Sequence, residues 1–247
     1  KNVLDEVEYI LREFPDVEEI MFEDDTLTIN KERCLELASE IQRRGLKFVW
    51  SANSRADIDL ETMQALKKAG ARLFCVGIES GEQAVLDAMK KNLKVEKVRQ
   101  FFKDAKKAGI MIHGCFLVGN PSETKATLEK TLAFAKELEP DTAQFFPIMV
   151  YPGTEAYGWA VKNGFLKSHD FSEWLTSDGM HNCVLSRPDL SDKDLVAFCD
   201  RARKEFYLRP SYIVRKFIQG LTDMHEMKRL VMGGVSLAKH MAMGGRK

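Results

Sequence analysis

The sequence has 247 residues, in which 37 Lys and Arg residues are balanced by 37 Asp and Glu residues. This balance gives no electrostatic reason to expect nucleic acid or an anionic membrane as a partner. No apolar run approaches the roughly 18 residues that span a bilayer, and there is no signal-peptide pattern, so a cytoplasmic protein without an integral membrane segment is expected.

Helical and strand patterns alternate through the first 150 residues. The spacing of apolar residues predicts helices over residues 2–14, 31–44, 59–69, 82–89, 95–108 and 122–138. Short apolar runs predict strands over residues 19–22, 47–50, 74–78, 110–118 and 142–150. This alternation indicates right-handed βαβ units and a parallel sheet. Polar residues follow the strands, which favours an α/β barrel or open barrel with its site at the carboxyl ends.

The strand at residues 74–78 organises this interpretation, because it runs directly into Glu79, Ser80 and Gly81. Successive residues of a strand alternate between its two faces. One face carries the bulky residues Phe74, Val76 and Ile78, and the other carries Leu73, Cys75, Gly77 and Glu79. The bulky face suits packing under helices. The slimmer face, which ends in a carboxylate, suits a cavity.

Polar residues near the other strand ends supply candidate ligands of a binding site. They are Glu23, Asp24, Asp25, Ser51, Asn53 and Arg55, which join Glu79. Such a set suits a zwitterionic ligand, with Arg55 on a carboxylate and the acids on an ammonium group or ribose hydroxyls. A purely structural role is the alternative, in which Arg55 pairs with a neighbouring acid. A third possibility is a magnesium-dependent lyase or hydrolase that uses Glu23, Asp25 and Glu79.

The five cysteines are odd in number and widely scattered. Their spacing argues against a disulfide framework and contains no zinc or iron–sulfur signature, so we predict no metal site and mostly buried, apolar cysteines. His113 shares a strand face with Cys115 and Leu117, and a histidine held by internal hydrogen bonds is the favoured interpretation over an acid or base.

The character of the sequence changes after residue 164. Residues 165–187 are aromatic and loop-like, with Trp174 and His181, and we expect substrate-specific contacts there. Helices are predicted over 191–207 and 210–239, with a frayed tail from residue 241. We therefore predict two domains, a partial barrel at 1–164 and a helical appendage at 165–247.

Five motifs resemble the radical S-adenosylmethionine (SAM) superfamily in their order and spacing. They are Phe-Glu-Asp-Asp at 22–25, Arg-Ala-Asp at 55–57, Gly-Ile-Glu-Ser-Gly at 77–81, Gly-Asn-Pro-Ser-Glu-Thr at 119–124 and Tyr-Pro-Gly-Thr at 151–154. The resemblance is to the branch that includes the methylthiotransferases and many cobalamin-dependent enzymes. Phe-Tyr-Leu-Arg-Pro at 206–210 is similar to the tail of the cobalamin-binding type, which includes anaerobic cyclases and methylases.

This resemblance implies a partial six-stranded barrel that binds SAM across the carboxyl ends of its strands. Glu79 and Ser80 correspond to the family's ribose-contacting strand end, and the segment with Phe116, Leu117 and Gly119 corresponds to the strand beside adenine. The remaining cofactor-binding residues that it implies, around the methionine moiety or the substrate, are Glu23, Asp24, Asp25, Ser51, Asn53 and Arg55.

The family's first strand and its Cys-x3-Cys-x2-Cys loop, which holds a 4Fe-4S cluster, are expected ahead of Lys1 and do not occur in this sequence. We therefore interpret the chain as a fragment that is inactive alone. The resemblance implies a parent enzyme that uses SAM, the cluster and cobalamin. Its reaction would be radical-based methyl transfer, C–H functionalisation or cyclisation of a small or lipid-like metabolite, with an electron donor such as flavodoxin or ferredoxin. A non-catalytic SAM-binding domain is a further alternative.

Overall fold

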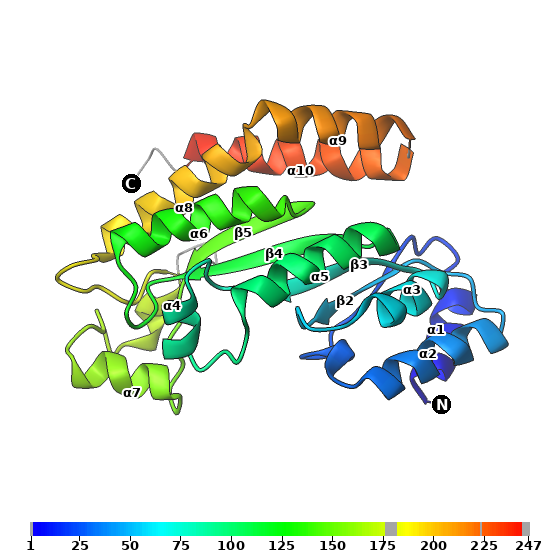
Figure 1. Ribbon diagram of the computed structural model, residues 1–247, viewed down its shortest axis with the longest axis horizontal. Helices are drawn as coiled ribbons and strands as arrows, with labels where there is room; N and C mark the ends of the chain where they lie inside the picture. The colour runs from blue at the N-terminus through cyan, green and yellow to red at the C-terminus, as the bar shows by residue number, and fades with distance from the viewer. Residues whose placement is uncertain (1, 176–181, 223, 244–247) are drawn as a thin grey trace. The chain divides into compact units, whose positions relative to one another are not determined.

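A computed structural model describes residues 2–175, 182–222 and 224–243 (Figure 1). Five strands form one sheet in the order β1-β2-β3-β4-β5. They are β1 (Ile20–Phe22), β2 (Trp50–Ser54), β3 (Ala71–Gly77), β4 (Met111–Val118) and β5 (Thr142–Pro147). Strands β1 to β4 pair in parallel. Because the spatial order follows the chain order, the sheet matches barrel topology and not a doubly wound fold. The predicted α/β fold class is confirmed.

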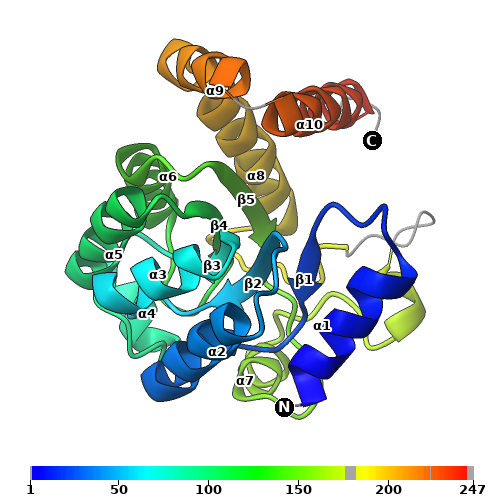
Figure 2. The ribbon, with the colours of Figure 1, turned by 90° about the vertical axis from the view of Figure 1, so that its right-hand side faces the viewer.

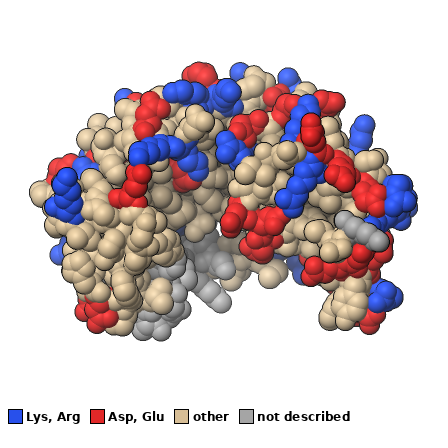
Figure 3. Space-filling model, turned by 90° about the horizontal axis from the view of Figure 1, so that it is seen from below, with Lys and Arg blue, Asp and Glu red and all other residues tan. Residues whose placement is uncertain are grey.

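Helices alternate with these strands and follow them. They are α1 (Asn2–Glu13), η1 (Leu27–Ile29), α2 (Lys31–Arg43), α3 (Leu60–Lys68), α4 (Gln83–Ala88), α5 (Val95–Ala108), α6 (Lys125–Leu138), α7 (Glu155–Lys162), η2 (Phe171–Trp174), α8 (Asp192–Tyr207), α9 (Pro210–Thr222) and α10 (Met224–Met243). Within the described residues, no helix is both long and apolar enough to cross a membrane. Figure 3 shows Lys and Arg side chains interspersed with Asp and Glu side chains on the face that it presents.

The chain divides into two compact units whose boundary passes through β4 and β5. Unit 1 comprises Lys1–Glu79, Lys90–Cys115 and Pro140–Ala143. Unit 2 comprises Ser80–Met89, Phe116–Glu139 and Gln144–Lys247. The domain boundary expected after residue 164 stays a prediction.

In unit 1, the two faces of β3 differ in burial as the sequence predicts. Phe74 and Val76 are fully buried, as is Ile78 just beyond the strand, whereas Cys75 and Gly77 are half-buried. Helix α3 contacts β3 and packs between α2 and α5 (Figure 2). The bulky face of the strand therefore forms the core of unit 1, and the slimmer face remains accessible.

Strand β2 begins at Trp50, which is the residue at which the sequence predicts that the strand ends. We expected residues 47–50, but the strand runs from Trp50 to Ser54 and pairs with β1 and β3. Trp50 is fully buried and its Nε1 donates to the Ala69 carbonyl at 2.7 Å, which fixes the start of the strand. Pairing with a strand on either side overrides the low strand propensity of the small polar residues that follow Trp50.

The N-cap of helix α6 lies two residues after the cap that the sequence predicts. Ser122 has a left-handed φ of 66°, whereas an N-cap residue has extended backbone. Thr124 is the N-cap, and it forms a capping box with Thr127. The expectation that Ser122 caps this helix is therefore wrong.

In unit 2, α6 packs against α8, and α9 lies beside α10 (Figure 1). The helical stretch expected over 210–239 comprises α9 and α10, on either side of residue 223, which lies outside the described residues. Residues 165–175 and 182–187 are more ordered than predicted, because Leu166 and Leu185 form an antiparallel bridge and Trp174 is buried in a local core. His181 and the rest of residues 176–181 lie outside the described residues, as do residues 244–247 of the predicted tail.

Candidate functional site

The half-buried face of β2, β3 and β4 in unit 1 includes the face of β3 that the sequence assigned to a cavity. Asn53 on β2 stands beside Cys75 on β3, which stands beside His113 on β4. One step further along, Gly77 pairs with Cys115. Parallel pairing places these residues on one face because each strand alternates in the same register. This face is the candidate site of unit 1.

Glu79, two residues after the end of β3, has a backbone conformation that non-glycine residues rarely adopt. Its φ is 67°, and the Cys115 carbonyl accepts hydrogen bonds from the N–H groups of both Ile78 and Glu79 at 3.0 Å. The Glu79 carboxylate pairs with Lys91 at 2.5 Å, and only 13% of its side chain is exposed. Strained backbone of this kind is concentrated at functional sites. The β4 carbonyl thus holds the Glu79 backbone in place at the carboxyl end of β3.

Gly77 provides the space for this ion pair. A Cβ atom at Gly77 would lie 2.4 Å from Glu79 Oε1 and 2.9 Å from Lys91 Nζ. Any larger residue would push the carboxylate and the ammonium group away from the strand. Because Gly77 has no side chain, it leaves a space beside β3, here called the cradle, in which Glu79 and Lys91 form their ion pair.

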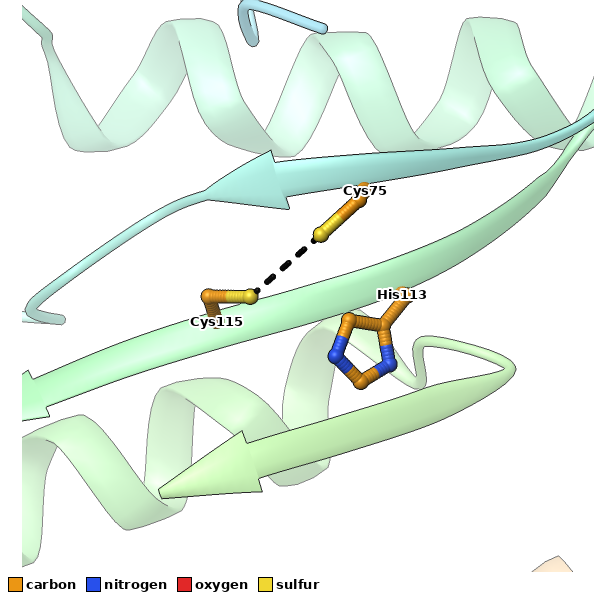
Figure 4. Close-up of side chains that lie close together, drawn as sticks. All are labelled: Cys75, His113 and Cys115. Carbon is orange, nitrogen blue, oxygen red and sulfur yellow. Dashed lines mark hydrogen bonds between the residues drawn. The ribbon is translucent and has the colours of Figure 1, made fainter. Parts of the chain in front are cut away.

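Cys75, His113 and Cys115 form a compact group on the same face (Figure 4). The two sulfur atoms are 3.6 Å apart, and His113 Nδ1 lies 2.7 Å from Thr142 Oγ1. The hydrogen bond between the thiols lowers the pKa of Cys75 and, together with burial, raises that of Cys115. Sequence analysis missed this group. The signal that could have revealed it is the parallel pairing of β3 with β4, which places residue 75 beside residue 113 and residue 77 beside residue 115 on one face.

The acidic residues after β1 are exposed, and some have structural partners. Asp24 pairs with Arg33 at 3.2 Å, and its carbonyl accepts from Asn53 Nδ2 at 3.1 Å. Arg55 pairs with Asp57 at 2.6 Å, as the structural alternative for this residue expected. Ser51 is only 7% exposed. Cofactor binding by these residues, and by Glu23 and Asp25, stays a prediction.

The three carboxylates of the magnesium hypothesis do not converge. Among the residues that the structure describes, Cys75, His113 and Cys115 are the set of at least three Cys, His, Asp or Glu residues whose potential metal-binding atoms lie within 4.8 Å of one another. Glu23, Asp25 and Glu79 form no such group, and Glu79 is engaged by Lys91. This geometry does not support the prediction of a magnesium site at these carboxylates.

In unit 2, two of the predicted cofactor residues point into the protein core. The Ser80 hydroxyl is fully buried and lies 3.1 Å from the Thr131 hydroxyl, which also accepts from the Gly81 N–H at 3.0 Å. Phe116 is fully buried and stacks on Phe145 with ring centroids 5.1 Å apart. Both side chains therefore have internal partners, and their contact with a cofactor stays a prediction. Leu117 is half-buried and Gly119 is buried, and contacts of this segment with a cofactor stay a prediction.

The loop after β4 is held by two buried charged residues, Glu123 of the 119–124 motif and Arg187, whose contacts the sequence did not predict. Glu123 Oε2 accepts from the N–H groups of Gly119 at 2.5 Å and Asn120 at 3.1 Å. Arg187 donates to the carbonyls of Asn120 and Glu123, each at 3.0 Å. Burial raises the pKa of Glu123 to about 7, although these amide hydrogen bonds oppose the rise. Glu123 thus holds backbone N–H groups of this loop, and Arg187 holds its carbonyl groups.

A hollow of about 400 Å³ opens in the aromatic region of unit 2. Its lining is partly aromatic and partly polar, and comprises Lys167, Ser168, Glu173, Trp174, Leu175, Asn182, Cys183 and Val184. All of these residues belong to the stretch in which we expected substrate contacts. Such a role stays a prediction.

The sequence model described as the radical SAM superfamily matches residues 1–135, which is more than half of the chain. The chain belongs to the radical SAM superfamily. The resemblance drawn from its five motifs is therefore confirmed, and membership associates the chain with SAM and a 4Fe-4S cluster.

Similar proteins include methyltransferases and a cyclase. An uncharacterized methyltransferase of Pyrococcus horikoshii is 30% identical over 220 residues, which are 89% of this chain and 47% of that protein. The anaerobic magnesium-protoporphyrin IX monomethyl ester cyclase of Rubrivivax gelatinosus is 29% identical over 237 residues, which are 94% of this chain and 40% of that protein. The chain thus spans about half the length of these relatives or less.

A solved structure shares the fold. The radical SAM methyltransferase TsrM from Kitasatospora setae, solved with cobalamin and a 4Fe-4S cluster bound, has a TM-score of 0.59 and 18% identity. The match covers 68% of this chain and 32% of that chain.

Proposed function

We propose that this chain forms the SAM-binding wall of a radical SAM enzyme that methylates or cyclises a small metabolite. The observation that carries the proposal is the position of Glu79, a partly buried carboxylate at the carboxyl end of β3 on the half-buried face of the sheet. In α/β barrels this end of the strands carries the active site.

Glu79 has the chemistry that the proposal needs. A carboxylate with two acceptor oxygens binds the two neighbouring hydroxyl groups of a ribose, and hydrogen bonds to a charged group are stronger than neutral ones. The cradle at Gly77 lets the carboxylate lie close to the strand beside Lys91. We propose that the ribose hydroxyls of SAM replace or share the Lys91 contact.

The residues of this chain do not fit the iron–sulfur cluster. Its five cysteines include no Cys-x3-Cys-x2-Cys loop. Cys75 and Cys115 are too close together, at 3.6 Å, for thiolates that each bind a different iron of a cluster. We therefore derive no reaction step through the cluster from these residues.

Methyl transfer or cyclisation is the reaction class that the relatives favour, since their names describe methyltransferases and a cyclase. Cobalamin is the additional cofactor we propose, because the structurally similar TsrM was solved with it bound. We further propose that a small or lipid-like substrate contacts the hollow near Trp174, and that flavodoxin or ferredoxin supplies electrons.

The proposed activity is tested with the protein as its gene encodes it, including any sequence that precedes residue 1. After anaerobic reconstitution with iron and sulfide, the protein is reduced and incubated with SAM. The proposal predicts 5'-deoxyadenosine or S-adenosylhomocysteine as a product, and the product distinguishes radical abstraction from methyl transfer. Iron-loaded protein that leaves SAM intact in the presence of a strong reductant would refute it.

A further inference from the structure

We propose that Cys75, Cys115 and His113 bind a single thiophilic metal ion, Zn²⁺, on the half-buried face of β3 and β4. The motifs that place the chain in its family do not include these residues, and the proposal does not depend on the proposed function. All three residues belong to unit 1, as does Thr142, which contacts His113.

The spacing of the sulfur atoms fits two ligands of one ion. In a tetrahedral zinc site with Zn–S bonds of about 2.3 Å, two thiolate sulfurs are separated by about 3.8 Å. Cys75 Sγ and Cys115 Sγ are 3.6 Å apart, whereas a disulfide would bring them to about 2 Å. The nitrogen of His113 and both sulfurs all lie within 4.8 Å of one another. Small side-chain movements therefore complete a three-ligand site.

His113 is oriented in the way that metal-binding histidines usually are. Its Nδ1 lies 2.7 Å from the Thr142 hydroxyl, and its ring lies on the same side of β4 as the two thiols (Figure 4). Metal-binding histidines generally use one ring nitrogen for the ion and the other for a hydrogen bond that fixes the ring. When Nδ1 donates to Thr142, the ring adopts the tautomer in which Nε2 carries the lone pair that a metal ion needs.

Charge and access also agree with a metal site. Two thiolates balance the charge of a divalent ion, and thiolate ligands favour zinc over the hard cations magnesium and calcium. Cys75 and Cys115 are half-buried, whereas Cys34, Cys183 and Cys199 are buried. An ion can thus reach the thiol groups of Cys75 and Cys115. Three protein ligands leave a fourth coordination position for water or a substrate atom, as in catalytic zinc sites.

The test uses the whole 247-residue chain, purified under reducing, metal-free conditions. Zn²⁺ is titrated against a chromophoric chelator, and Co²⁺ is added separately as a spectroscopic probe. We expect one Zn²⁺ per chain, and a thiolate-to-cobalt charge-transfer band. Cys75→Ser, Cys115→Ser and His113→Gln should each weaken zinc binding at least tenfold, and the cysteine variants should lose intensity in the band.

Cys34→Ala is the matched control, because Cys34 is a cysteine of the same unit that lies outside the group. It should bind Zn²⁺ as the wild type does. Thr142→Val, which removes the partner of His113, should weaken binding by about tenfold. Circular dichroism verifies that each variant is folded. Folded wild-type protein that binds no stoichiometric Zn²⁺, or binding that survives the three ligand substitutions, would overturn the proposal. A Cys75–Cys115 disulfide in anaerobically purified protein would also overturn it.

Discussion

Replacing Glu123 by glutamine should remove a pH dependence of stability that this buried carboxyl group imposes. Burial raises its pKa from an ordinary 4.5 to about 7. The folded state therefore holds this proton more tightly than the unfolded state, so its stabilising effect is complete below pH 4.5 and is lost as the pH rises through 7. A difference of about 2.5 pKa units, at 1.36 kcal/mol each, corresponds to about 3 kcal/mol.

The substituted glutamine would keep an amide oxygen that accepts from the N–H groups of Gly119 and Asn120, but its side chain does not titrate. Between about pH 5 and pH 8, the free energy of unfolding of Glu123→Gln should therefore rise relative to wild type by about 2.5 kcal/mol. Urea denaturation monitored by tryptophan fluorescence at a series of pH values measures this difference. Glu129→Gln, at an exposed carboxylate paired with Arg201, is the control and should follow the wild-type profile. Parallel profiles of wild type and Glu123→Gln would refute the reasoning.

Substitutions at three further positions test the local packing, each by urea denaturation. The Glu79→Gly variant should be more stable than the Glu79→Gln variant by about 1 kcal/mol, because glycine accepts the left-handed φ of 67° without strain. The reverse order of stability would contradict the strain argument. Gly81→Ala should cost about 1–3 kcal/mol, since its Cβ would lie 2.6 Å from Phe134 Cβ, and wild-type stability would show that α6 can move. Arg187→Met should cost about 2–3 kcal/mol, because it leaves the carbonyls of Asn120 and Glu123 without this donor, and a neutral effect would argue against its role in the loop.

Much of the fold could be predicted because the chain repeats a strong local pattern. Alternation along β3 predicted which side chains enter the core and which remain half-buried, since a strand has a strict period of two. The extension of β2 to Ser54 was missed because Ser51, Asn53 and Ser54 have low strand propensity, and only pairing with β1 and β3 makes them a strand. Helix α7 was missed although Thr154 caps it, because its eight residues give a short periodic signal.

The candidate site could be predicted only where one segment supplied the whole signal. The motif at residues 77–81 placed Glu79 at a strand end, where the structure has it. Contacts that join distant segments carry no local signature. Lys91 reaches Glu79 from twelve residues away, and the hydrogen-bonded cysteines are forty residues apart. Arg187 lies 64 residues from the Glu123 carbonyl that it binds. Ser80 and Phe116 are buried and pack internally, which the motif alone did not indicate, and their contact with a cofactor stays a prediction.

The most direct test of the central claim is to measure the affinity of this chain for SAM with and without the Glu79 carboxylate. Equilibrium dialysis with radiolabelled SAM compares wild type with Glu79→Ala, and Glu61→Ala serves as a control at an exposed acid of the same unit. The account predicts that wild type and the control bind SAM alike and that Glu79→Ala binds at least tenfold more weakly, as expected for a lost charged hydrogen bond to the ribose. Equal affinity of all three proteins, or folded wild type that does not bind SAM, would contradict it.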